Sequence, residues 1–225
     1  MNKLIRGLFL LVSIATLSAC ASFPAGWSAS CQLPSGSYTN QDGIVSMTLD
    51  GDEIDSCHRG KSLSKRKQRS EIKYPVLLNH KYSFEYEFKY SGAGGASILQ
   101  LHPGSAGANH GGDIWYECSV FDFRAGFKRA RLNIPGLAEL YPISDEDYKD
   151  KWHRVKFTFR ASNDDPLYIV EFDGKKVFDS SEHSGKVDLC YYPNQKPNLK
   201  IGLYRGKRSA TESISYRDLK VTRLD

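Results

Sequence analysis

The sequence contains no apolar run long enough to cross a membrane as a helix. The longest one, from Leu8 to Ile14, falls well short of the ~20 residues that a span requires. No Pro-rich or Ser-rich linker divides the chain and no internal repeat is present, so we expect one domain with a substantial core. Close pairs of cysteine or histidine are also missing, which argues against a structural zinc site.

The first residues are typical of a processing signal and are not expected to be part of the fold. Lys3 and Arg6 precede the apolar run, and small residues follow it up to Cys20, as in a secretory signal. The sequence Leu17-Ser18-Ala19-Cys20 resembles the lipobox of bacterial lipoproteins. This resemblance implies cleavage before Cys20 and a diacylglycerol thioether on its sulfur. The alternative is an ordinary signal peptide that happens to be followed by cysteine.

The lipobox resemblance sets the expected boundaries and location. We expect residues 1–19 to be the signal peptide, residues 20–30 a tether, and residues 31–225 the folded domain. The lipid on Cys20 would hold the protein in the cell envelope. Since the two residues after Cys20 lack the aspartate associated with inner-membrane retention, an outer-membrane location is expected if the source is Gram-negative.

Net charge is low, but its distribution is uneven. The chain has 31 cationic residues, and removing Lys3 and Arg6 leaves 29 against 26 acidic ones. Residues 59–73 nevertheless concentrate cations, which indicates a polyanionic partner. Outside the cell, an acidic polysaccharide or an anionic lipid surface fits this cluster better than nucleic acid does.

The remaining cysteines indicate disulfides. Besides Cys20 there are four: Cys31, Cys57, Cys118 and Cys190. An even number in an oxidising compartment predicts two disulfides, and the sequence leaves all three pairings open.

Two-residue periodicity dominates the chain and predicts an all-β fold. Residues 82–90, YSFEYEFKY, place aromatic side chains on one face and polar ones on the other. Residues 154–160 and 167–172 alternate in the same way, and Asp173-Gly174 supplies a two-residue hairpin turn after the latter. A further strand is expected near the C-terminus. Many short strands of this kind predict a concanavalin A-like β-jelly roll, a two-sheet antiparallel sandwich.

Three other segments have weaker signals. Residues 144–151 predict a short helix, because Ser144 can cap a turn rich in acidic residues. The glycine-rich residues 91–97 lack the Lys-Ser/Thr of a phosphate-binding loop and predict a flexible hairpin tip. Residues 53–55, Glu-Ile-Asp, begin like the Glu-x-Asp-x-Glu of laminarinase-like glycoside hydrolases. Cys57 occupies the place of the second catalytic carboxyl, so an acidic turn is the better interpretation.

Three short motifs occur in order along the chain. They are Arg69-Ser70-Glu71-Ile72, Gln100-Leu101-His102 and Lys200-Ile201-Gly202-Leu203-Tyr204. Together they resemble the three strand motifs of jelly-roll alginate lyases, and the last also resembles that of heparin lyase type I and glucuronan lyases. The chain departs from the alginate lyase pattern at Asn198, where a tyrosine is usual, and at Gly206, where a glutamine is usual.

The spacing within each motif places its polar groups on one side of a strand. Residues i and i+2 share a face, so Gln100 lies beside His102, and Lys200 lies on the side of Tyr204. If the three strands belong to one sheet, these groups converge on one groove. Gly202 would leave room there for a sugar ring to approach the backbone.

The resemblance implies a polysaccharide lyase that cleaves a uronate-containing anionic polysaccharide by β-elimination. A base removes the C5 proton of the uronate, and an acid protonates the departing O4. Arg69 and Gln100 would neutralise the carboxylate and the developing enediolate, because a guanidinium fork and an amide both donate to oxygen. His102 is the candidate base.

Tyr204 is the candidate acid, or both base and acid where the two groups leave from one face of the sugar. The nearby cation Lys200 would favour the phenolate form. Glu71 is the expected orienting partner of Arg69.

Further residues are expected to hold the polymer around the cleavage point. The expected substrate-binding residues are Lys200, Glu71, Lys67, Arg66, Arg205 and His110. No motif requires a metal or other cofactor, and calcium stays open because no loop has a convincing series of oxygen ligands. We expect a monomer with an anionic polysaccharide as partner, a membrane contact through Cys20 and no nucleic acid. The alternative class is a non-catalytic, lectin-like lipoprotein that binds acidic glycans.

Overall fold

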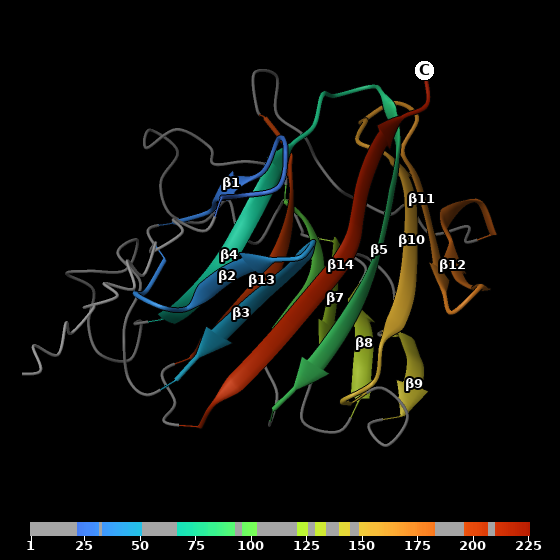
Figure 1. Ribbon diagram of the computed structural model, residues 1–225. Coiled ribbons are helices and arrows are strands. Elements are labelled where there is room, and N and C mark those ends of the chain that lie inside the picture. The colour runs from blue at the N-terminus through green and yellow to red at the C-terminus, as the bar shows by residue number, and fades with distance from the viewer. Residues whose placement is uncertain are drawn as a thin grey trace, which may run out of the picture.

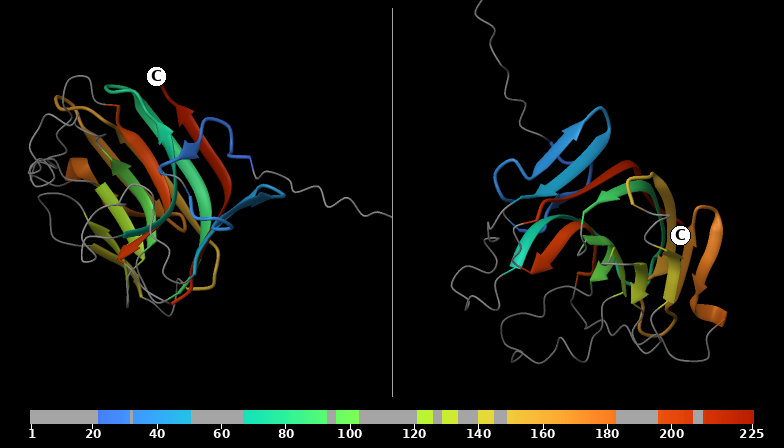
Figure 2. Two further views of the ribbon diagram at one scale, coloured as in Figure 1. Left: turned by 90° about the vertical axis from the view of Figure 1, so that its left-hand side faces the viewer. Right: turned by 90° about the horizontal axis from the view of Figure 1, so that it is seen from below.

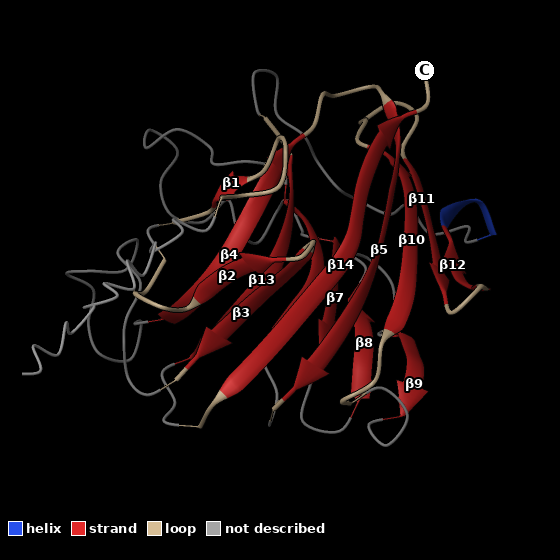
Figure 3. Ribbon diagram, viewed as in Figure 1, coloured by secondary structure: helices blue, strands red, loops and turns tan. Residues whose placement is uncertain are grey.

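The computed structural model describes residues 22–31, 33–50, 67–92, 96–102, 121–125, 129–133, 140–144, 149–182, 196–206 and 210–225. Within these ranges the chain forms two antiparallel sheets packed face to face, with no α-helix (Figures 1 and 3). The expected all-β jelly-roll sandwich is therefore confirmed.

The first sheet has seven strands in the order β1-β4-β13-β6-β7-β8-β9. Their bounds are β1 Ser28–Ala29, β4 Lys67–Pro75, β13 Asn198–Gly206, β6 Ala96–His102, β7 Phe121–Ala125, β8 Arg129–Asn133 and β9 Leu140–Ser144. The sheet joins segments far apart in sequence, because its central strand β13 comes from the last part of the chain and pairs with β4 and β6.

The second sheet also has seven strands, in the order β12-β11-β10-β5-β14-β3-β2. Their bounds are β12 Lys175–Asp179, β11 Leu167–Phe172, β10 His153–Arg160, β5 Lys81–Ser91, β14 Glu212–Arg223, β3 Ile44–Leu49 and β2 Tyr38–Gln41. A 3-10 turn, Ser180–Glu182, follows β12. Figure 2 shows the two layers from two further sides.

The strand predictions for the second sheet are confirmed. The five aromatic residues that alternate along β5, from Tyr82 to Tyr90, are all buried between the sheets. Asp173 and Gly174 connect β11 to β12 with φ angles of 46° and 77°. Two successive positive φ angles are what a tight hairpin turn of this twist requires.

Aromatic packing joins the two layers. The Phe123 ring of the first sheet packs edge-on against Phe88 and Phe172 of the second, with centroids 6.3 and 5.8 Å apart. Burying a phenylalanine side chain contributes ~1.5–3 kcal/mol, and edge-on ring pairs add to that. These contacts fix the separation of the sheets and the position of β7 beside β6.

A β-bulge in β6 determines which of its side chains face outward. The pairing register with β7 shifts between Ser97 and Leu99, so that Ile98 and Leu99 are both fully buried. The carbonyl of Ile98 accepts hydrogen bonds from the hydroxyls of Tyr86 and Tyr216, at 3.3 and 3.4 Å. Because the bulge resets the alternation, the next polar residues of β6 lie on the outer side.

Two predictions about local structure are wrong. Ser144 is the last residue of β9 and Lys149 forms a parallel bridge with Tyr90, so the helix expected over residues 144–151 is absent from its described positions. The glycine-rich segment 91–97 does not join neighbouring strands of a hairpin. It connects β5 in the second sheet to β6 in the first, and therefore carries the chain from one layer to the other.

The expected tether is largely part of the domain. Trp27 is 7% exposed and packs against Tyr74 and Phe84, with ring centroids 5.6 and 5.5 Å apart. Nearer the N-terminus, the Ser22 carbonyl accepts a hydrogen bond from the Asn40 side chain at 2.7 Å. Buried aromatic surface and sheet pairing through β1 hold residues 22–30 on the sandwich. Cys20 lies outside the described residues.

Candidate functional site

The three sequence motifs lie on three adjacent strands. β13 pairs with β4 on one side and with β6 on the other. Tyr204 is directly opposite Arg69, whereas Lys200 is opposite Gln100, and Asn198 is opposite His102. Motifs separated by about 30 and 100 residues are thus neighbours in one sheet.

The polar residues of these motifs occupy the outer side of the first sheet. Their sequence neighbours Ile72, Leu101 and Leu203 are fully buried in the core, and side chains alternate along a strand. We call this surface the Arg69 face. Its described polar side chains include Arg69, Glu71, Lys73, Gln100, His102, Asp122, Asn198, Lys200 and Tyr204.

The Arg69 guanidinium is held by three different groups. Its Nη1 donates a hydrogen bond to the sulfur of Cys31 at 3.3 Å, and its central carbon lies 4.5 Å from the centroid of the Tyr204 ring. Nη1 also lies 3.8 Å from Oε2 of Glu71. A guanidinium stacked on a ring is attracted by the ring quadrupole, which fixes its plane relative to Tyr204.

Glu71 is a buried acid surrounded by cations. It is only 2% exposed, and its Oε2 accepts no hydrogen bond from the described residues. Lys200 Nζ lies 3.9 Å from this oxygen, at an ionic rather than hydrogen-bonding distance. Burial lowers the pKa of Lys200, and the charges of Arg69 and Lys73 lower it further, although Glu71 opposes them. Among the described residues of this face, Arg69, Lys73 and Lys200 carry three formal positive charges against the two negative charges of Glu71 and Asp122. The remaining positive charge would stabilise an anionic ligand here.

His102 is neutral in this environment. It is 6% exposed, and its pKa is lowered to about 3, first by burial and then by the charges of Lys200 and Arg69. The uncharged ring keeps a lone pair available at any ordinary pH. The low pKa also makes that lone pair a weak base.

Two residues of the Arg69 face were missed by the sequence interpretation. Asp122 lies opposite Gln100 in the β6–β7 pairing and is 3% exposed, and Lys73 lies opposite Lys200. Asp122 sits between Phe121 and Phe123, so the two-residue alternation was the signal that could have revealed it. Lys73 continues the i, i+2 series that begins at Arg69.

The structure separates other predicted site residues from this surface. The Arg205 side chain is fully buried between the sheets, where its Nε donates to Gln68 at 2.8 Å and its Nη1 lies 3.4 Å from Glu212. Arg205 therefore holds the fold together instead of binding substrate from the Arg69 face, which corrects that prediction. Arg66 and His110 lie outside the described residues, as does the side chain of Lys67.

Gly202 has a different role from the one expected. Its φ is 133°, and a Cβ atom built on it would lie 2.3 Å from the carbonyl oxygen of Ser70 and 2.6 Å from the sulfur of Met47. Met47 is a fully buried residue of the second sheet, so a side chain at position 202 would point into the core. Close backbone packing at this bulge is therefore a reason for glycine here that does not depend on a ligand.

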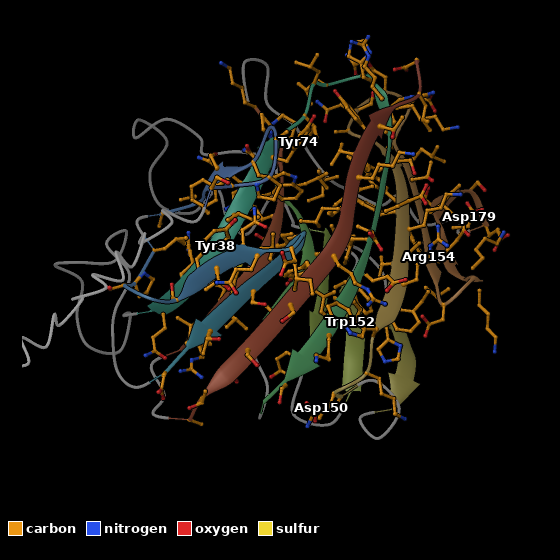
Figure 4. All side chains as sticks on the ribbon, in the orientation of Figure 1. Tyr38, Tyr74, Asp150, Trp152, Arg154 and Asp179 are labelled. Carbon is orange, nitrogen blue, oxygen red and sulfur yellow. The ribbon has the colours of Figure 1, made fainter. Side chains whose placement is uncertain are left out.

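The outer side of the second sheet is organised differently. Its acids are paired closely with cations: Arg154 with Glu85 at 3.1 Å, Lys156 with Glu171 at 3.4 Å and Arg217 with Glu87 at 2.5 Å. Arg217 also covers the ring of Trp152, 4.3 Å from its centroid; Trp152 and Arg154 are labelled in Figure 4. Exposed ion pairs of this kind contribute little stability and leave no buried, unbalanced charge. The Arg69 face is therefore the better candidate site.

Neither a metal site nor a membrane span is found among the residues described. Within the described ranges, no group of three or more His, Cys, Asp or Glu side chains is placed to hold an ion. No helix in these ranges is long and apolar enough to cross a membrane.

Comparison with known proteins gives structural relatives only. No family profile matches the chain, and no curated protein matches it. Among solved structures, the alginate lyase A1-II' has a TM-score of 0.56 at 10% identity, over 84% of this chain and 82% of that one. The crystallised variant carries a His→Asn and a Tyr→Phe substitution and is in complex with substrate.

Two further structures share the fold. A sialidase has a TM-score of 0.54 at 11% identity over 89% of this chain, which spans only 17% of the sialidase. An endo-1,3-beta-glucanase from Streptomyces sioyaensis has a TM-score of 0.50 at 10% identity over 91% of both chains. At these identities the likeness establishes a shared β-jelly roll and nothing finer.

Proposed function

We propose that this protein is a polysaccharide lyase that cleaves a uronate-containing anionic polysaccharide by β-elimination. The observation that carries the proposal is the meeting of Arg69, Gln100, His102 and Tyr204 on one face of adjacent strands. Jelly-roll structural relatives include an alginate lyase crystallised with substrate, and this likeness supports a glycan ligand.

The first requirement of the reaction is to neutralise the uronate carboxylate. Removing the C5 proton next to an ionised carboxylate adds a second negative charge to the same group. Arg69 supplies a cation with five N–H donors, enough to serve both Cys31 and a carboxylate. Gln100, two residues before His102 on β6, supplies an amide donor to the developing enediolate.

His102 then takes the C5 proton. The neutral His102 ring can accept a proton, and a bound substrate carboxylate makes this ring a stronger base. Burial is the largest cause of the low pKa of His102, and the charges of Lys200 and Arg69 lower that pKa further. An anion bound between the two cations offsets their part of the shift and raises the pKa, which makes the ring a stronger base.

Tyr204 completes the elimination. As the C5–H bond breaks, its electron pair forms the C4–C5 double bond and the C4–O4 bond breaks. The Tyr204 phenol donates its proton to the departing O4 and is left as a phenolate beside the Arg69 guanidinium, which stabilises it. Where both groups leave from one face of the sugar, Tyr204 serves as base and acid in turn.

The test is the ultraviolet absorbance of unsaturated uronides. Wild-type protein should raise this absorbance with at least one of alginate, glucuronan, heparin and hyaluronan. A flat baseline with every polymer, together with measurable binding to one of them, would support the alternative function below.

The second candidate is a non-catalytic, lectin-like protein that binds acidic glycans. The observation in its favour is His102, which is 6% exposed and has a pKa of about 3. A nearly buried, weakly basic ring suits hydrogen bonding to a bound sugar better than proton abstraction. Substitution of His102 would then weaken binding without any turnover to lose.

The protein is further proposed to be a lipoprotein anchored at Cys20 in the cell envelope. The packing of residues 22–30 on the domain gives this proposal a structural consequence. Only Ala21 separates Cys20 from Ser22, and two residues span at most ~7 Å. The β2 edge of the sandwich would lie directly at the membrane, without a tether to keep it away.

A further inference from the structure

We infer that Cys31 is a positioning residue for Arg69 and acts through its disulfide. The inference rests on the proposed function, because it concerns the guanidinium that is proposed to bind the uronate carboxylate. Cys31 is disulfide-bonded and 8% exposed, and its partner lies outside the described residues. No contact between Cys31 and the substrate is required.

The sulfur of Cys31 fixes one end of the Arg69 guanidinium. Nη1 of Arg69 donates to this sulfur at 3.3 Å, while the Tyr204 ring lies 4.5 Å from the guanidinium carbon. A ring defines the plane of the guanidinium but leaves it free to turn within that plane. The hydrogen bond to sulfur restricts this rotation more directly than Glu71 does, because Oε2 of Glu71 is 3.8 Å from the same nitrogen and the sulfur is 3.3 Å from it.

The sulfur is itself held in place by the backbone. Strand β1 pairs with β4 through Ser28 opposite Lys73 and Ala29 opposite Ile72. The Ser30 N–H then donates to the Glu71 carbonyl at 2.9 Å. Cys31 therefore follows directly after a segment that is fixed to the same strand that carries Arg69.

The disulfide fixes the side-chain rotamer of Cys31, which the backbone pairing leaves free. In a reduced cysteine the thiol can rotate about the Cα–Cβ bond between staggered positions, and two of the three point the sulfur elsewhere. A bond to a second cysteine selects one position. Reduction by a dithiol such as dithiothreitol, which becomes a cyclic disulfide as the protein gains two thiols, restores the rotation.

Loss of this support should reduce turnover without removing Arg69. Misplacing a substrate-positioning group by ~1 Å can cost ~100-fold in rate. We expect dithiothreitol to lower kcat/KM of the mature wild-type protein by about tenfold or more, at a temperature where circular dichroism shows that the reduced protein is still folded.

A cycle with Arg69→Lys separates positioning from a general structural effect. A lysine cannot make the forked contact, so reduction of Arg69→Lys should change its residual kcat/KM by less than about twofold. Equal losses in the wild type and in Arg69→Lys would overturn the inference. If the wild type cleaves no polymer, the proposed function fails, but the positioning role can still be tested. The effect of reduction on the Kd for a bound polymer is then compared between the wild type and Arg69→Lys, and equal effects would overturn the inference.

A measurement on the oxidised protein covers the case in which the reduced protein unfolds. The Arg69 guanidinium resonances, assigned by their loss in Arg69→Lys, should show slow rotation about the Nε–Cζ bond. Fast rotation, as in an exposed arginine, would overturn the inference without any need for reduction.

Discussion

The guanidinium of Arg69 stacks on the ring of Tyr204, with 4.5 Å between its carbon and the ring centroid. The two residues are opposite each other on β4 and β13, so the contact follows from strand register. It joins the group proposed to bind the carboxylate to the group proposed to protonate O4. A single bound sugar can thus contact both the guanidinium and the phenol.

Tyr204→Phe keeps the ring and removes the proton donor. We expect kcat to fall by ~10²–10⁴-fold, the usual contribution of general acid–base catalysis, while the Kd for the polymer changes little. Tyr74→Phe is the matched control, because Tyr74 lies on β4 but packs toward Trp27. Normal turnover in Tyr204→Phe would remove the phenol from the mechanism.

Lys200→Gln should raise the pKa of His102. The Lys200 charge lowers that pKa after burial does, so removing the charge favours the protonated ring. Titration of the His102 ring by NMR would show the change. A pKa that stays at its wild-type value would mean that Lys200 does not act on His102.

Acid should weaken the fold through His102. Its pKa is lowered from 6.5 to about 3, so the unfolded chain binds the proton more readily. The free energy of unfolding therefore falls as the pH is lowered through this window, by on the order of 5 kcal/mol for the full shift.

The variant His102→Gln tests this dependence. It should flatten the dependence of unfolding free energy on pH between about 6.5 and 3, as measured by denaturant titration. His80→Gln is the control, because the His80 side chain is partly exposed and contacts the C-terminal residue Asp225 instead of the Arg69 face. An unchanged slope in His102→Gln would contradict the assignment.

Gly202→Ala should destabilise the protein by about 3 kcal/mol. The new methyl group would meet the Ser70 carbonyl and the Met47 sulfur, and the backbone has a φ of 133°. Gly43→Ala is the control: its φ is also positive, but its added Cβ would meet nothing within 4 Å, so only about 1 to 2 kcal/mol is expected. Equal thermal unfolding of the two variants would show that close packing at Gly202 is unimportant.

The alternation of side chains allowed much of this structure to be predicted. It identified β5, β10, β11 and β14, and it placed Arg69 with Glu71 and Gln100 with His102 on common faces. The same rule argues against Arg205 as a ligand of the Arg69 face, since a residue next to Tyr204 points to the other side. Arg205 was predicted to bind substrate from its charge alone, without regard to the alternation of side chains along the strand.

Features set by tertiary contacts could not be predicted in this way. The bulge in β6 depends on Tyr86 and Tyr216, which lie on two strands of the opposite sheet. The contact of Cys31 with Arg69 depends on strand β1, which is only two residues long. The close packing at Gly202 involves Ser70 and Met47, which are both distant in sequence. Local patterns contain no information about such neighbours.

The most direct test is the position of a bound uronate. A crystal structure of Tyr204→Phe with an oligouronate chosen by binding should place the sugar carboxylate within ~3 Å of the Arg69 guanidinium and the Gln100 amide. The C5 carbon should then face His102. An oligouronate bound on the second sheet near Trp152, or on the Arg69 face with its carboxylate directed away from Arg69, would contradict the proposed function.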